Sequence, residues 1–252
     1  MIRFIGICKI LVVTTIFLTT AITNYSQTKM PEIPVLCYHQ IRDLKPGDSK
    51  VFVTSPQHFA LQMKTLSDSG YHVILPDQLI NYLTKHTPLP SKPVLLTFDD
   101  GPETQMTYAV PVLNQYHFKA IFFVMTVSLN HKFYISPQQL KALSDEGFVI
   151  GCHTWDHHMV TRYKNNDWTK QIEKPKQQLE KITGKPVQYF AYPYGEWNET
   201  AVQQLEKDNF KAAFQLTESR SSVNAVYTIR RLMVQDEWKG RQLVSAMKGN
   251  FR

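Results

Sequence analysis

The chain has 252 residues, of which 43% are hydrophobic and 12% aromatic, enough for one large or two small domains with a buried core. Charged residues make up 19%, too few for a disordered polyelectrolyte, and ten glycines and fourteen prolines argue against a collagen-like or low-complexity chain. The net charge of +7 raises the question of a nucleic-acid partner, but the lysines of residues 170–185 alternate with Glu and Gln as on a solvated helix face, so we expect none.

The N-terminus has the order of a secretory signal peptide. Arg3 and Lys9 precede an uncharged, mostly apolar run over residues 10–23, and a polar stretch follows. We predict a signal peptide over residues 1–27, cleaved near 26–28; the alternative is an uncleaved membrane anchor. Its removal would lower the net charge to about +5, a modest positive surface that suits an anionic envelope or polymer. Export predicts a secreted or cell-envelope protein, in which Cys37 and Cys152 either form a disulfide or remain two buried free thiols.

Strand-like and helix-like patterns alternate along the rest of the chain. Strands are predicted at 33–39, 71–75, 93–99, 120–125, 148–153, 187–192, 212–216 and 227–234. Helices are predicted at 55–66, 77–83, 108–116, 136–147, 167–183, 198–207 and 241–248. Ser-Pro pairs open the first and fourth helices, Asn198 caps the sixth, and Pro175 should kink or split the fifth.

This alternation indicates an α/β protein with a mainly parallel sheet. At this length a closed or nearly closed β/α barrel is the simplest arrangement, with its active site at the C-terminal ends of the strands. The alternative is an open doubly wound sheet, but the sequence has no Gly-rich phosphate loop to support it.

Polar clusters follow several of the predicted strands. They are Thr97-Phe98-Asp99-Asp100-Gly101, the segment HTWDHH over residues 153–158, and AYPYG over residues 191–195; His39 ends the first strand. In a β/α barrel these segments converge on one mouth. One Asp and two His are a common ligand set for Zn²⁺ or Fe²⁺ that leaves coordination positions open.

TFDDG followed by HTWDH resembles the polysaccharide deacetylases of carbohydrate esterase family 4, the NodB-homology domain. The resemblance runs from about residue 33 to the C-terminus. It implies a distorted (β/α)7 barrel, a single NodB-like domain over residues 28–252, and metal-dependent removal of acetyl groups from a glycan.

By motif position, the resemblance implies that Asp99 is the catalytic base. Asp100, His153 and His157 would bind the metal, with His158 as a competitor of His157. The backbone N–H of Tyr194 would stabilise the oxyanion. The metal is expected to be zinc, with cobalt, nickel or iron as alternatives.

Two features depart from the family pattern. Ala191 stands near the position of an Arg that orients the catalytic Asp in many members, and no His follows His158 to act as the general acid. The segments FAYPYG and PVLCYH resemble the branch that deacetylates poly-β-1,6-N-acetylglucosamine. In that branch a His of the first strand, here His39, fills the acid's place. Arg230 or Arg231 is the candidate for the missing guanidinium.

The sequence therefore predicts a secreted, metal-dependent glycan N-deacetylase acting on poly-N-acetylglucosamine as a monomer, with possible membrane or cell-surface association. Chitin, peptidoglycan and O-acetylated xylan remain open as substrates. A catalytically inactive glycan-binding barrel is the main alternative; an iron oxygenase is a weaker one, since TFDDG does not fit its usual ligand spacing. Four aromatic residues near the motifs are candidates for sugar contacts: Trp155, Tyr194, Trp197 and Trp238.

Overall fold

A computed structural model of the chain describes residues 31–216 and 219–251. The predicted signal peptide or anchor, residues 1–27, lies outside the described residues. Within them, every helix is too short or too polar to cross a bilayer.

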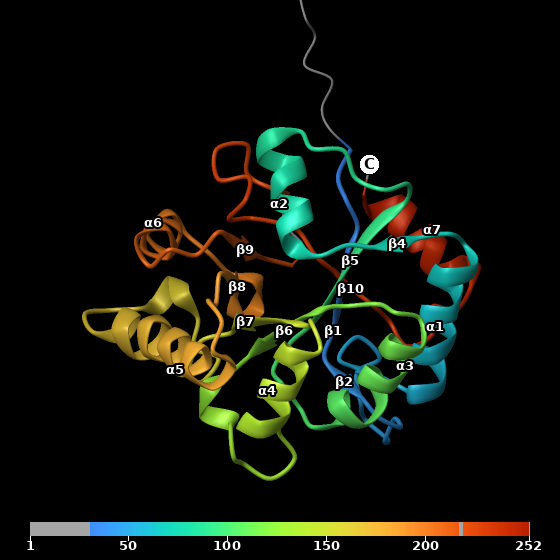
Figure 1. The fold of residues 1–252 in the computed structure, drawn as a ribbon, viewed down its shortest axis with the longest axis horizontal. Coiled ribbons are helices and arrows are strands. Elements are labelled where there is room, and N and C mark those ends of the chain that lie inside the picture. Colours follow the sequence, from blue (N-terminus) through green and yellow to red (C-terminus); the bar gives the residue numbers. More distant parts are fainter. Residues whose placement is uncertain (1–30, 217–218, 252) are drawn as a thin grey trace, which may run out of the picture. The chain divides into compact units, whose positions relative to one another are not determined.

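The strands are β1 (Val35–Tyr38), β2 (Gln40–Ile41), β3 (Val53–Thr54), β4 (His72–Val73), β5 (Pro93–Phe98), β6 (Ile121–Val124), β7 (Val149–Cys152), β8 (Tyr189–Ala191), β9 (Ala212–Phe214) and β10 (Leu232–Met233). Seven of them form a parallel sheet in the order β10-β1-β5-β6-β7-β8-β9 (Figure 1). The short β4 pairs with the start of β5, and β2 pairs with β3 separately.

The two ends of this sheet are joined by the segment that leads into β10. Ile229 donates its backbone N–H to Ala213 of β9 and accepts one from Gln215, at 3.0 and 2.9 Å. The chain then enters β10, which pairs with β1. The sheet therefore curls into a distorted seven-stranded barrel, as predicted, and the open doubly wound sheet is excluded.

The helices are α1 (Pro56–Asp68), α2 (Pro76–Lys85), α3 (Val110–Gln115), α4 (Pro137–Asp145), α5 (Lys174–Thr183), α6 (Glu199–Lys207) and α7 (Arg241–Asn250). The predicted caps are confirmed. The side chains of Ser55, Ser136 and Asn198 accept hydrogen bonds from backbone N–H groups in the first turns of α1, α4 and α6.

The predicted split of the fifth helix is confirmed. It divides into a π-helical turn, Thr169–Glu173, and α5, because Pro175 in the first turn of α5 has no N–H to donate. Two other predicted elements differ from those observed. The helix predicted over 108–116 begins earlier, with a π-helical turn at Gln105–Ala109. The strand predicted over 227–234 shrinks to β10, because Thr228 is held in a turn by its hydroxyl, which accepts from the N–H of Ser221.

Alternate residues of the strands face two separate cores. Even-numbered residues of β1 and β5, such as Leu36 and Leu96, join the large cluster between the sheet and the helices around it. Odd-numbered residues, such as Val35 and Leu95, face the barrel lumen together with Phe123. Gly151 also faces the lumen: a Cβ there would lie 2.4 Å from the ring of Phe123. Apolar side chains therefore fill the middle of the lumen, and the polar side chains that face the lumen lie at one end of it.

Helix α2 differs from the other helices, because its buried Leu79 belongs to the lumen cluster. Its Asp77 accepts hydrogen bonds from Tyr189 at the start of β8, at 2.7 Å, and from Lys211 just before β9, at 2.9 Å. Helix α2 thus covers the end of the barrel where the strands begin. Helix α2 does not cover the opposite end of the barrel, where the strands finish and where the candidate functional site lies.

Candidate metal and active site

The alternation of the strands directs polar side chains into the lumen mouth. Asp99 follows Thr97 on the lumen side of β5, and His153 follows Gly151 of β7. His39 follows β1 and Arg231 precedes β10, the neighbour of β1. The backbone of Asp100 takes a left-handed conformation, φ 70°, which turns its carboxylate away from the strand direction toward the two His.

Asp99 and Arg231 form a buried, bidentate ion pair. The guanidinium donates to Oδ1 at 2.6 Å and to Oδ2 at 2.7 Å, and the two side chains are 2% and 0% exposed. Burial alone would raise the pKa of Asp99, but the charge of Arg231 and the hydrogen bonds it donates hold this pKa well below its usual range. Asp99 is therefore ionised and fixed in one orientation. Arg230, the other candidate, pairs instead with Glu32.

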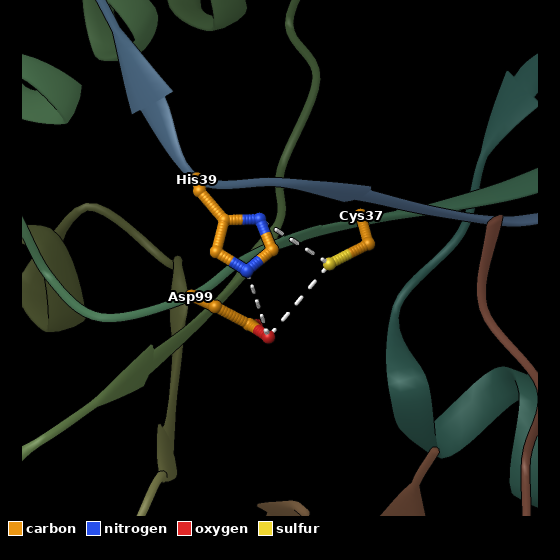
Figure 2. Close-up of side chains that lie close together, drawn as sticks. All are labelled: Cys37, His39 and Asp99. Carbon is orange, nitrogen blue, oxygen red and sulfur yellow. Dashed lines mark hydrogen bonds and ion pairs between the residues drawn. The ribbon is translucent and has the colours of Figure 1, made fainter. Parts of the chain in front are cut away.

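His39, at the end of β1, points toward the carboxylate of Asp99 (Figure 2). Its Nε2 lies 4.0 Å from Asp99 Oδ2. The side-chain amide of Gln105 donates to the backbone carbonyls of both His39 and Asp99, each at 2.7 Å, and so ties the ends of β1 and β5 together. Gln105 was not predicted as a site residue, because it precedes the helix predicted over 108–116 and nothing in the local sequence indicates that it is completely buried.

Asp100, His153 and His157 form a compact cluster beside Asp99. The Nε2 atoms of His153 and His157 lie 3.5 and 3.8 Å from Oδ1 of Asp100. Burial raises the pKa of Asp100 to about 6 and lowers that of His153 to about 3, so His153 is neutral at physiological pH, the form that binds metals.

These residues fit a divalent metal. The Nδ1 of His153 lies 2.8 Å from the carbonyl oxygen of Ala191, so it carries the proton and Nε2 carries the lone pair. That Nε2 is buried and, among the described residues, has no hydrogen-bond partner. A buried acceptor of this kind costs about 1–3 kcal/mol unless a ligand satisfies it. Together with Oδ1 of Asp100 and Nε2 of His157, Nε2 of His153 forms a set of three metal-ligand atoms that lie within 4.8 Å of one another.

His158 lies outside this cluster. It is exposed, its ring stacks on Tyr163 at 5.8 Å, and its carbonyl accepts the Tyr163 hydroxyl. His157 turns inward because its backbone is left-handed, φ 67°, and its N–H donates to the Thr154 hydroxyl.

Replacing His157 by Ala is therefore expected to weaken binding of Zn²⁺ to the cluster by at least tenfold, because one of three protein ligands is lost. His158→Ala, the adjacent and exposed His, is the matched control and should bind Zn²⁺ like the unchanged protein. Isothermal titration of metal-stripped protein measures both. Equal affinity losses in the two variants would contradict this assignment of the ligands.

The predicted aromatic residues divide into two groups. Tyr194 is 56% exposed and its ring lies 4.5 Å from that of His157, while Trp155 follows the motif His and packs under Lys170. Trp197 and Trp238 are partly buried against the large core cluster. The positions of Tyr194 and Trp155 suit contacts with a ligand, and those of Trp197 and Trp238 suit a packing role.

A cavity of about 400 Å³ opens beside the Asp-His-His cluster. Asp100, Met125, Val127, Ser128, His131, Tyr134, Asp156 and His157 line it. His131 and Tyr134 were not predicted as site residues, because the loop after β6 carries no recognisable motif. A larger cavity, of about 530 Å³, lies between α1 and α7 and contains none of the predicted site residues.

Cys37 and Cys152 are both free and buried, so the predicted disulfide alternative is wrong and the free thiols are confirmed. The physical reason is the pleat of the sheet. Cys37 lies on the lumen side of β1 and Cys152 on the helix side of β7, and β5 and β6 lie between them. Neighbouring strands are about 4.8 Å apart, so the gap is well beyond the reach of a disulfide.

The mouth of this parallel β/α barrel brings together a carboxylate and two imidazoles, a set of side chains that can bind a divalent metal, beside a second carboxylate that is held in one orientation. The polysaccharide deacetylase family model matches residues 86–213. The chain belongs to the polysaccharide deacetylase family, whose members are hydrolases.

Three curated relatives cover much of the chain. The putative polysaccharide deacetylase YxkH of Bacillus subtilis is 27% identical over 84% of this chain and 75% of its own length. The peptidoglycan-N-acetylglucosamine deacetylase of Bacillus cereus is 30% identical over 62% of this chain and 55% of its own. The poly-beta-1,6-N-acetyl-D-glucosamine N-deacetylase of Staphylococcus epidermidis is 25% identical, over 80% and 78%. The chain thus spans between about half and three quarters of these relatives.

Solved structures agree on the fold. The deacetylase PplD of Streptococcus pyogenes, in complex with acetate, superposes with a TM-score of 0.80 at 25% identity, over 86% of this chain and 99% of that one. IcaB from Ammonifex degensii superposes with a TM-score of 0.72 at 26% identity, over 86% and 97%. The predicted distorted barrel and family are confirmed; the roles of individual site residues stay predictions.

Proposed function

We propose that this chain is an exported, metal-dependent N-deacetylase that removes acetyl groups from poly-β-1,6-N-acetylglucosamine as a monomer, close to the cell surface. The proposal rests on how the side chains at the mouth of the barrel are arranged. The Asp-His-His cluster lies beside a buried carboxylate held by Arg231, and His39 points toward the same carboxylate.

Asp100, His153 and His157 are the residues that would hold the metal. A divalent ion there, most simply zinc, would polarise the acetyl carbonyl and lower the pKa of a bound water. Asp99 would accept the proton of the attacking water at Oδ2, which lies 3.8 Å from Nε2 of His153. The Arg231 guanidinium keeps Asp99 ionised and holds its carboxylate in one orientation. Because it also lowers the pKa of Asp99, it makes Asp99 a weaker base.

The other two steps concern the oxyanion and the leaving amine. The backbone N–H of Tyr194 is our candidate for the oxyanion contact, since this residue lies on the turn beside His157. His39 would protonate the amine, because an amine leaves only when it is protonated. Its side chain is 11% exposed, so it lies between the lumen and the mouth.

The glycan preference rests on the comparisons and on the position of His39. The Staphylococcus epidermidis relative is named for poly-beta-1,6-N-acetyl-D-glucosamine, and the IcaB structure is similar over most of both chains. The peptidoglycan enzyme of Bacillus cereus makes peptidoglycan the second candidate substrate. Export is supported by the order of charged, apolar and polar residues at the N-terminus.

Replacing His39 by Asn is expected to slow deacetylation of the amide substrate by about 10²–10⁴-fold, the usual contribution of a general acid. An acetate ester of a good leaving group needs no such proton, so p-nitrophenyl acetate hydrolysis should fall far less. Parallel assays of the two substrates measure the difference. Equal losses on amide and ester would contradict the acid role of His39.

The substrate is tested by acetate release from a panel of poly-β-1,6-N-acetylglucosamine, chitin oligomers, peptidoglycan and acetylated xylan, with the metal content measured on the same sample. We expect the highest kcat/KM on poly-β-1,6-N-acetylglucosamine. A higher kcat/KM on peptidoglycan would show that peptidoglycan, the second candidate, is the preferred substrate. Binding to a glycan without acetate release from any of them would indicate the inactive binding barrel.

A further inference from the structure

A second group of donor atoms lies directly beside the Asp-His-His cluster. Cys37, His39 and Asp99 bring a thiol, an imidazole and a carboxylate together at the ends of β1 and β5 (Figure 2). The Sγ of Cys37 lies 3.7 Å from Asp99 Oδ2 and 4.0 Å from Nδ1 of His39, and Nε2 of His39 lies 4.0 Å from the same carboxylate oxygen.

An imidazole gives only one of its two nitrogens to an ion, so the set has three ligand atoms: the thiol sulfur, one ring nitrogen of His39 and one carboxylate oxygen. The donor atoms all lie within 4.8 Å of one another. A point equidistant from three atoms that are 4.8 Å apart is about 2.8 Å from each, so the side chains would close in by about half an ångström to reach the ordinary Zn–S and Zn–N bond lengths of about 2.3 and 2.0–2.1 Å. A set of one sulfur, one nitrogen and one oxygen favours Zn²⁺, Co²⁺ or Cd²⁺ over Mg²⁺ or Ca²⁺.

We propose that Cys37, His39 and Asp99 form a second binding site for a thiophilic divalent cation, next to the first. On binding, the S–H bond of Cys37 is replaced by a sulfur–metal bond, and the proton passes to solvent. No electron transfer is involved. One ring nitrogen of His39 binds through its lone pair, so any proton on that nitrogen also passes to solvent, and the ionised carboxylate of Asp99 binds without further change.

The charges around the site allow this ion. Burial raises the pKa of the Cys37 thiol, so it becomes a thiolate only when the ion displaces its proton. Asp99 and that thiolate then carry two negative charges, which attract the ion, whereas Arg231 and the ion of the neighbouring cluster repel it. Arg231 also occupies one side of Asp99 Oδ2, at 2.7 Å, and leaves the side that faces Cys37 and His39. Because the three ligands are 0 to 11% exposed, the ion would be largely shielded from water.

Occupation would inhibit the enzyme, a consequence that rests on the proposed function. The ion would engage both the proposed base, Asp99, and the proposed acid, His39, which the reaction needs free. Zinc at one equivalent should therefore support deacetylation, and excess zinc should inhibit it. The Cys37→Ala variant should need at least tenfold more zinc for the same fractional inhibition.

The binding is tested with Co²⁺ alone, titrated into metal-stripped full-length protein while the near-ultraviolet spectrum is recorded. A cobalt–thiolate bond gives an intense charge-transfer band there, and binding to oxygen and nitrogen ligands does not. We expect two bound ions, with the band appearing as the second one binds. Neither the number of bound ions nor the charge-transfer band depends on catalysis, so both measurements test the second site even if the proposed function is wrong.

The controls separate the two sites. Cys37→Ala should bind one ion and lose the band, whereas Cys152→Ala, the other buried thiol of the described chain, should keep both. His157→Ala should weaken the first ion and keep the band. A single bound ion or a missing band in the unchanged protein overturns the proposal whether or not the variants fold, and so does a band that persists in Cys37→Ala.

Discussion

Asp99→Asn is expected to lower kcat for deacetylation by about 10²–10⁴-fold, because an amide cannot accept the proton of the attacking water. It should also destabilise the fold by about 3–5 kcal/mol, since the guanidinium of Arg231 would remain buried without its counter-charge. Acetate release and urea unfolding measure the two effects. The metal cluster keeps its three ligands, so the variant should still bind one equivalent of Zn²⁺.

The control for stability is Asp145→Asn, the same substitution in an ion pair whose partners are about half exposed, Lys141–Asp145. Exposed pairs of this spacing contribute only about 0.3–0.5 kcal/mol, so the midpoint of unfolding should hardly move. If Asp99→Asn deacetylated at the full rate, Asp99 would not be the base, whatever its effect on stability.

Arg231→Gln is expected to be the second large change, with a loss of about 3–5 kcal/mol at neutral pH from a carboxylate left buried without its partner. Without the charge of Arg231, the largest opposing cause, burial raises the pKa of Asp99. A fraction of the base would be protonated at neutral pH. The acid limb of the rate profile should therefore move to higher pH, and activity should partly recover as the pH is raised.

The stability of the two proteins should respond to pH in opposite directions. In the unchanged protein the folded-state pKa of Asp99 lies below its unfolded value, so its contribution is present above the unfolded pKa and is lost as the pH falls through the folded one. In Arg231→Gln the folded-state pKa lies above the unfolded value, so the variant becomes less stable as the pH rises. Denaturant unfolding between pH 4 and 8 follows both trends.

Arg230→Gln is the matched control, since the neighbouring side chain pairs with Glu32 near the surface. Its effect should be about 1 kcal/mol or less, and its rate profile should keep the acid limb of the unchanged protein. An identical pH profile for Arg231→Gln would show that this guanidinium does not set the protonation of Asp99.

Local sequence patterns were sufficient to predict the barrel and the approximate positions of its main helices. The motif residues were predicted to converge because parallel strands end on one side of a sheet, and Asp99, Asp100, His153 and His157 do lie together. The choice between His157 and His158 depended on a left-handed backbone at His157, which the sequence alone does not reveal.

Partners distant in the chain were predicted less well. Arg230 and Arg231 are adjacent, and only the pleat of the segment that joins β9 to β10 directs Arg231 inward. Gln105 bridges two strand ends that lie far apart in the sequence. The separation of Cys37 from Cys152 depends on the order of the strands in the sheet, which spacing in the chain does not give.

Acetate release from poly-β-1,6-N-acetylglucosamine by metal-stripped protein, before and after the addition of one equivalent of Zn²⁺, tests the central claim most directly. Asp100, His153 and His157 are its proposed ligands. We predict that the stripped protein releases no acetate above background and that one equivalent of Zn²⁺ or Co²⁺ restores the rate. Full activity of the stripped protein, or no release from this or any other acetylated glycan after metal is restored, would contradict it.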